Sequence, residues 1–228
     1  MKISEIEKML TNGDCSDELL RQFKTALNRV PASHRCQHCY TTAVGMNLKF
    51  SNQAVALIEY GLGFCDSWSD KMLAYYNMAV IYERCSDYEN ALLCYKQALS
   101  AVPIDSSGSP NKAYAPEYAF HMLRVQMLMN GFEYSDDLRY YYELSNQADE
   151  FSKSFLNKTF YRKLAEIIIL DHDGKTDEMK TAIKKADEML QPDFAGPLYS
   201  LLKRKRYTET TGATKEALKF LKNVKKNS

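Results

Sequence analysis

The residues best suited to bind a metal lie in one short segment, His34-Arg35-Cys36-Gln37-His38-Cys39. Thiolates and imidazoles are ligands that zinc prefers in proteins. A closed zinc site needs four such ligands, however, and no second C-x-x-C follows the first. Cys36 and Cys39 lie three residues apart, and on a helix they would share one face and pack into the core. We therefore expect packed, reduced thiols here, with no metal and no cofactor.

The rest of the sequence offers no recognisable catalytic constellation. It contains no G-x-x-x-x-G-K-[ST], no G-x-G-x-x-G after a strand, no G-x-S-x-G and no H-E-x-x-H. Four histidines (His34, His38, His121 and His172) are spread along the chain. No catalytic residue is assigned, and we expect a protein that is not an enzyme.

Charge is distributed unevenly along the chain. From Ala195 to Ser228, nine Lys or Arg residues stand against two acids, a balance of +7, and the residues before Ala195 carry −6. The run Lys203-Arg204-Lys205-Arg206 could bind nucleic acid or an anionic surface. No basic face with interleaved aromatics accompanies it, and cations near a helix C-terminus are also favoured by the helix dipole. Nucleic-acid binding is therefore an alternative that we do not favour.

Composition favours a helical protein with a sizeable core. Hydrophobic residues make up 45% of the 228 residues, while Gly (9) and Pro (6) are scarce. This scarcity of helix-breaking residues favours long helices over a β-sandwich or β-barrel, which would need many turns. No apolar stretch of about 18 residues exists, and acids stand near the N-terminus where a signal peptide would be apolar. We expect a cytoplasmic protein without membrane insertion, whose six cysteines are reduced.

A helix pair is clearest between Met72 and Pro103. On its first helix, Tyr75, Met78, Ala79 and Tyr82 share one face by their spacing. After Cys85-Ser86-Asp87, a second helix carries Ala91, Tyr95 and Ala98, and Pro103 ends it. This spacing resembles the tetratricopeptide pattern W-x2-L-G-x2-Y…A-x3-F…P. The small residues allow the two helices to approach closely.

The same pattern returns along the chain at fixed offsets. Ile3 to Pro31 matches this unit at an offset of 72, which leaves room for a middle pair that includes Gly45 and Gly61. Phe120 to Tyr140 matches at an offset of 45, after a breaker-rich insertion at Ile104–Pro110, and Ile167 to Ala186 matches at 88. Further helices are expected at Ala195–Arg206 and at Thr214–Lys225, with Thr214 as N-cap.

We therefore predict an all-α fold with two parts. Residues 1–192 form about five tetratricopeptide-like helix pairs, which the resemblance implies are wound into a right-handed superhelix. Residues 193–228 form C-terminal capping helices with a basic tail. The resemblance further implies a concave groove lined by the first helix of each pair. The groove residues expected on this basis are Leu73, Tyr76, Asn77, Val80, Glu83, Tyr118, His121, Met122, Val125, Tyr161, Leu164 and Ile168.

A largely aromatic and aliphatic groove suits a protein or peptide ligand. An adaptor that binds such a partner is the favoured function. A peptide-sensing regulator of the Gram-positive type is the second hypothesis, and a nucleic-acid or anionic-surface binder through the basic tail is the third. The groove could also be filled by the protein's own last helices, or by a second copy of the chain in a homo-oligomer.

Overall fold

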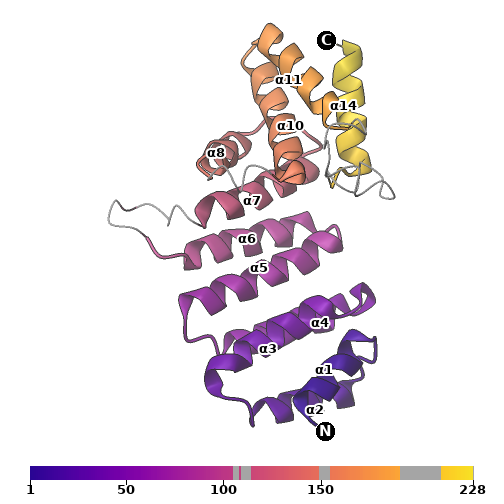
Figure 1. The fold of residues 1–228 in the computed structure, drawn as a ribbon, viewed down its shortest axis with the longest axis vertical. Coiled ribbons are helices and arrows are strands. Elements are labelled where there is room, and N and C mark those ends of the chain that lie inside the picture. The colour runs from indigo at the N-terminus through magenta and orange to yellow at the C-terminus, as the bar shows by residue number, and fades with distance from the viewer. Residues whose placement is uncertain (105–107, 109–113, 149–154, 191–211, 228) are drawn as a thin grey trace. The chain divides into compact units, whose positions relative to one another are not determined.

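The fold is known from a computed structural model, which describes residues 1–104, 108, 114–148, 155–190 and 212–227. These residues contain eleven α-helices and no β-strand, and the helices pack as sequential pairs. The predicted all-α, repeat-like architecture is confirmed (Figure 1). The chain divides into two compact units, residues 1–111 (unit 1) and 112–228 (unit 2). The predicted boundary near residue 192 and the predicted helix at Ala195–Arg206 lie outside the described residues.

Unit 1 consists of three helix pairs that follow one another along the chain (Figure 1). The first helices of successive pairs also contact each other, α1 with α3 and α3 with α5. Helices α3 and α5 begin 36 residues apart, the repeat length expected from the sequence. The elements are α1 (Ile3–Thr11), α2 (Asp17–Leu27), α3 (Ala32–Gly45), the short 3-10 helix η1 (Leu48–Phe50), α4 (Ser51–Leu62), α5 (Trp68–Arg84) and α6 (Tyr88–Ala101).

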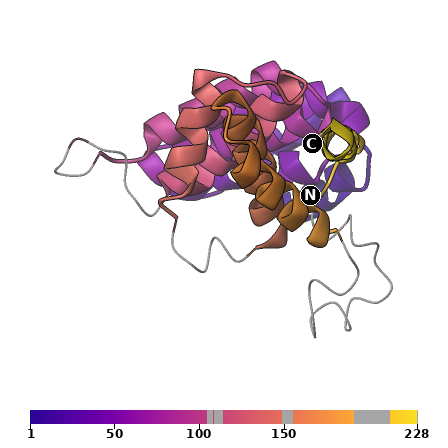
Figure 2. The ribbon, with the colours of Figure 1, turned by 90° about the horizontal axis from the view of Figure 1, so that it is seen from above.

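Unit 2 contains two pairs and a terminal helix. Helix α10 packs against α11 and also against both helices of the preceding pair, while α14 packs on α11. Figure 2 looks nearly along the axis of α14, the yellow helix. The elements are α7 (Ala115–Met129), α8 (Asp136–Ser145), α10 (Leu156–His172), α11 (Thr176–Glu188) and α14 (Lys215–Asn227).

Several helix boundaries have a local cause in the sequence. The side chains of Ser16, Ser67, Asp87 and Ser135 each accept a hydrogen bond from a backbone N–H in the first turn of the helix that follows. Thr214 does the same for α14, since its Oγ1 accepts from the N–H of Ala217 at 3.2 Å, and its predicted role as N-cap is confirmed.

The core of unit 1 follows many of the predicted repeat positions, although Tyr75 and Tyr82, expected on the core face of α5, are only partly buried. Ala79, Ala91 and Ala98 are fully buried between helices, as are Phe23 and Tyr95. Gly61 shows why a small residue is needed between α3 and α4, because a Cβ there would lie 2.5 Å from the Cβ of Cys39. Close approach of the helices thus depends on residues that the repeat pattern requires to be small.

The fourth pair departs from the predicted register at one position. Tyr140 was expected on the core face of the second helix, but it is 54% exposed. The neighbouring Tyr141 is buried instead, together with Leu138 and Ser145. These three residues are spaced three and four apart, so the core face of α8 is rotated by one residue from the repeat pattern.

Candidate functional site

The predicted groove residues of α5 lie on a partly exposed face of that helix. Leu73 is 36% exposed, and Tyr76, Asn77, Val80 and Glu83 are partly buried. Ala74, Met78, Ala79 and Ile81 fill the core side. One face of α5 therefore packs in the core, and the predicted groove residues lie on a different, more exposed face. These five residues are at least partly accessible, while the groove and partner binding stay predictions.

Contacts with α6 hold part of this face in place. The hydroxyl of Tyr95, a buried residue of α6, donates to a carboxylate oxygen of Glu83 at 2.9 Å. The ring of Tyr76 lies 5.8 Å from the ring of Tyr95, centroid to centroid. The Nδ2 of Asn77 donates to the carbonyl oxygen of Leu73 at 2.7 Å. Tyr76 and Glu83 therefore also stabilise the packing of α5 on α6, whereas Leu73 and Val80 provide apolar surface on the same face.

The seven groove residues expected on α7 and α10 are not exposed. Tyr118, His121, Met122 and Val125 on α7, and Tyr161, Leu164 and Ile168 on α10, are all at most 8% exposed. The reason is the packing of α10 against α7 and α8, which places these faces inside unit 2. The Tyr161 hydroxyl also donates to the carbonyl oxygen of Gly212 at 3.0 Å and accepts from the Thr214 N–H at 3.3 Å. The expectation of an open groove is wrong for these seven side chains.

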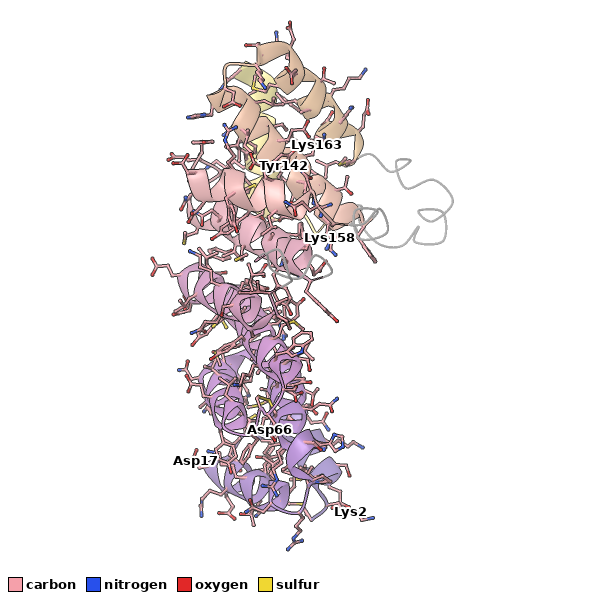
Figure 3. The ribbon with its side chains drawn as sticks, turned by 90° about the vertical axis from the view of Figure 1, so that its left-hand side faces the viewer. Lys2, Asp17, Asp66, Tyr142, Lys158 and Lys163 are labelled. Atoms are coloured by element: carbon pink, nitrogen blue, oxygen red, sulfur yellow. A yellow bond between two sulfur atoms is a disulfide. The ribbon has the colours of Figure 1, made fainter. Side chains whose placement is uncertain are left out.

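A partly buried carboxylate accompanies this packing. The carboxylate of Glu117 forms ion pairs with His121 Nε2, at 3.3 Å, and with Lys158, which Figure 3 labels at the start of α10. Burial raises the pKa of Glu117, but hydrogen bonds from His121 and Lys158, together with their charges, outweigh this effect and lower the pKa to about 2. Glu117 therefore joins α7 to α10 as an anion.

A polar pocket of about 280 Å³ lies between α1 and α3, lined by Glu7, His34, Gln37, His38 and Thr41. His38 Nδ1 lies 2.5 Å from Glu7 Oε1. The four-residue spacing of His34 and His38 places both on one face of α3. The spacing of the two histidines can be read from the sequence, but their proximity to Glu7 of α1 depends on the fold.

The cysteines differ from the sequence prediction. Cys36 is bonded to Cys65 in a disulfide, with 5.4 Å between the Cα atoms. The pair joins α3 to the turn before α5, where Figure 3 labels the adjacent Asp66. The prediction of reduced thiols is wrong for this pair, because folding brings together two residues that the sequence separates by 29 positions.

Cys39, the other member of the C-x-x-C, is a free thiol in the core. Burial raises the pKa of this thiol to about 12. The neutral thiol is neither a good nucleophile nor a good metal ligand. Across the described ranges, no group of three or more His, Cys, Asp or Glu residues is arranged to hold a metal ion. Cys39 is best described as a small core residue of α3.

The basic run at residues 203–206 lies outside the described residues. Helix α14 carries several of the remaining C-terminal cations, and Lys225 pairs with Asp187 of α11 at 2.7 Å. Ala217 and Leu221 face the core of unit 2 from α14. At least one cation of this helix therefore serves its docking on α11. Helices of sufficient length and apolarity to cross a bilayer do not occur in the described ranges.

Comparison with known proteins gives one match. A family model described as "Tetratricopeptide repeat" matches residues 73–103. No curated protein and no solved structure matches the chain significantly. The matched residues cover most of α5 and all of α6, the pair with the clearest repeat pattern. Residues 73–103 are therefore a tetratricopeptide repeat.

Proposed function

We propose that the chain is an adaptor that binds a protein or peptide ligand, and that the exposed face of α5 contributes to binding. The observation that carries the proposal is the repeat at residues 73–103, a module that suggests protein–protein interaction.

The local chemistry of α5 fits an apolar segment of a partner. Leu73 and Val80 lie seven residues apart, two turns on one side of the helix, with Tyr76 and Asn77 between them. Trp68, at the start of the same helix, is 40% exposed. Aromatic and aliphatic side chains of this kind supply much of the binding energy at protein interfaces. Asn77 and Glu83 provide polar groups at the edge of this surface.

The experiment compares two variants of the same repeat, a double substitution on α5 and a single substitution on α6. A tagged full-length chain captures partners from a native extract, mass spectrometry identifies them, and the purified partner is titrated with each variant. Leu73→Glu/Val80→Glu places two charges on the proposed surface and is expected to weaken binding about tenfold or more. Leu93→Glu is the matched control, because Leu93 is 54% exposed on α6, the second helix of the repeat.

Thermal melts establish that all proteins in the comparison are folded. Binding that is lost in the α5 variant and retained in the α6 variant supports the proposal. Equal affinity of the wild type and the α5 variant for every captured partner would contradict it, as would equal loss in both variants.

A further inference from the structure

A pocket of about 330 Å³ lies in unit 2. Three elements form it: the turn after α7, the C-terminal end of α10 and one face of α14. Ile168 and Phe132 are buried at its apolar part, and Glu133 and Asp171 are exposed at its edge. The lining residues are Phe132, Glu133, Tyr134, Ile168, Asp171, His172, Phe220 and Val224.

Aromatic side chains give this pocket ordered walls. Phe132 stacks on Phe220 of α14, with 5.0 Å between ring centroids and 15° between the ring planes. Phe132 has a φ of +65°, a left-handed conformation that is unfavourable for a bulky residue, and its burial compensates for this cost. Tyr134 stacks on His172 with a centroid distance of 3.5 Å.

A hydrogen-bond network fixes the orientation of Tyr134. Its hydroxyl accepts from Arg139 Nε at 3.0 Å and donates to Asp136 Oδ1 at 3.0 Å. The Arg139 guanidinium also donates to both carboxylate oxygens of Asp173, at 3.2 and 2.5 Å. The wall of the pocket is thus formed in the free protein, which reduces the cost of ordering on binding.

The charge at the pocket edge is negative and uncompensated within the described part of the chain. Neither Glu133 nor Asp171 forms an ion pair with another described residue. Arg139 forms an ion pair with Asp173, and His172 also contacts Asp173, at 3.3 Å. Two carboxylates beside an apolar, aromatic pocket are complementary to a cation that carries its charge on a flat apolar surface.

We propose that this pocket binds an arginine side chain of a partner protein or peptide. A guanidinium group stacks on aromatic rings and donates to carboxylates in the same plane, which a lysine ammonium cannot do. The site already holds a guanidinium between an aromatic residue and a carboxylate, because that of Arg139 lies 5.3 Å from the centroid of the Tyr134 ring while it is bonded to Asp173. The proposal concerns unit 2 and does not depend on binding at α5.

The test titrates short capped peptides into the full-length, isotope-labelled chain and follows its NMR spectrum. Acetyl-Gly-Arg-Gly-amide is the probe, and the citrulline peptide is its neutral isostere. Saturable shifts are expected at Phe132, Ile168 and Val224 with the arginine peptide. Because a hydrogen bond to a charged group contributes about 1.5–3 kcal/mol, affinity for the citrulline peptide is expected to fall about tenfold or more. The lysine peptide is expected to bind more weakly than the arginine peptide.

Substitutions locate the binding site. Glu133→Gln/Asp171→Asn removes both edge charges from exposed positions and is expected to reduce arginine-peptide affinity about tenfold or more. Glu178→Gln/Glu188→Gln removes two exposed acids from α11 and is expected to leave the affinity unchanged. Equal binding of arginine and citrulline peptides, equal or tighter binding of the lysine peptide, shifts confined to other residues, or no saturable shift would each overturn the proposal.

Discussion

At Gly61, the lack of a side chain allows α4 to pack closely against α3. The ideal Cβ position there is 2.5 Å from the Cβ of Cys39, closer than side-chain carbons approach in proteins. We predict that Gly61→Ala forces α3 and α4 apart and lowers the free energy of unfolding by about 1–3 kcal/mol, a typical cost of overpacking. Urea denaturation measures the change.

Gly63 provides the matched control for this substitution. It lies two residues further on, and a Cβ added there would meet its nearest neighbour at an ordinary 3.5 Å. Gly63→Ala is therefore expected to change stability little. The contact between Gly61 and Cys39 does not limit the approach of α3 and α4 if Gly61→Ala unfolds at the wild-type urea concentration. The same conclusion follows if both variants lose equal stability.

The Glu117 carboxylate links stability to acid pH. Its pKa in the folded protein is lowered to about 2, below the value of about 4.5 for a free carboxyl. The folded state therefore binds a proton less readily than the unfolded state, and the stabilisation is complete above pH 5 and lost as the pH falls toward 2. We predict that Glu117→Gln makes unfolding free energy less dependent on pH between 5 and 2.

Urea titrations at several pH values measure that dependence. The side chain of Glu117 is 38% exposed, and solvent screening reduces the size of the effect without changing its sign. Asp177→Asn, an exposed acid in the first turn of α11, is the control and is expected to retain the wild-type slope. If the unfolding free energy of Glu117→Gln depends on pH as strongly as that of the wild type, the lowered pKa of Glu117 is contradicted.

At the scale of elements, the Cys36–Cys65 disulfide connects α3 to the turn before α5. A cross-link between residues 29 positions apart restricts the unfolded chain, and the loop-entropy relation gives about 3–4 kcal/mol for a loop of this length. We predict that a reducing agent, or Cys36→Ser/Cys65→Ser, lowers the free energy of unfolding by about this amount.

Thiol counting and urea denaturation check the prediction together. Without reductant the denatured protein should show four free thiols, from Cys15, Cys39, Cys85 and Cys94. Cys85→Ser, which changes an exposed free thiol, should remain as sensitive to reductant as wild type. Six reactive thiols in protein purified without reductant, or stability independent of reductant, would argue against the disulfide.

The helix pairs themselves could be predicted because their signals are local. Aromatic and apolar residues at helical spacing predicted α5 and α6, and Asp173-Gly174-Lys175, which contains a residue typical of turns, connects α10 to α11. Gly174 has a φ of +69° in that turn, a conformation that glycine adopts without steric cost. Signals of this kind act within a few residues and do not depend on the rest of the fold.

At the scale of the whole chain, the features missed by sequence reasoning depend on contacts between distant residues. Cys36 meets Cys65 only when α3 and α4 have packed against each other. The expected groove residues of α7 and α10 are buried because α10 contacts both α7 and α8, whereas a regular repeat pattern implies one exposed face. The pocket proposed to bind arginine likewise needs α14, whose approach to α10 is not encoded in local spacing.

The bond from the Tyr161 hydroxyl to the carbonyl of Gly212 has a consequence for the order of folding during synthesis. Each pair of unit 1 is formed by sequence neighbours, and α1 to α6 can assemble as soon as those residues leave the ribosome. Tyr161 on α10 has to wait until residues 212–214 have been made, about 50 residues later. During translation, the contacts between Tyr161 and residues 212–214 therefore form later than the helix pairs of unit 1.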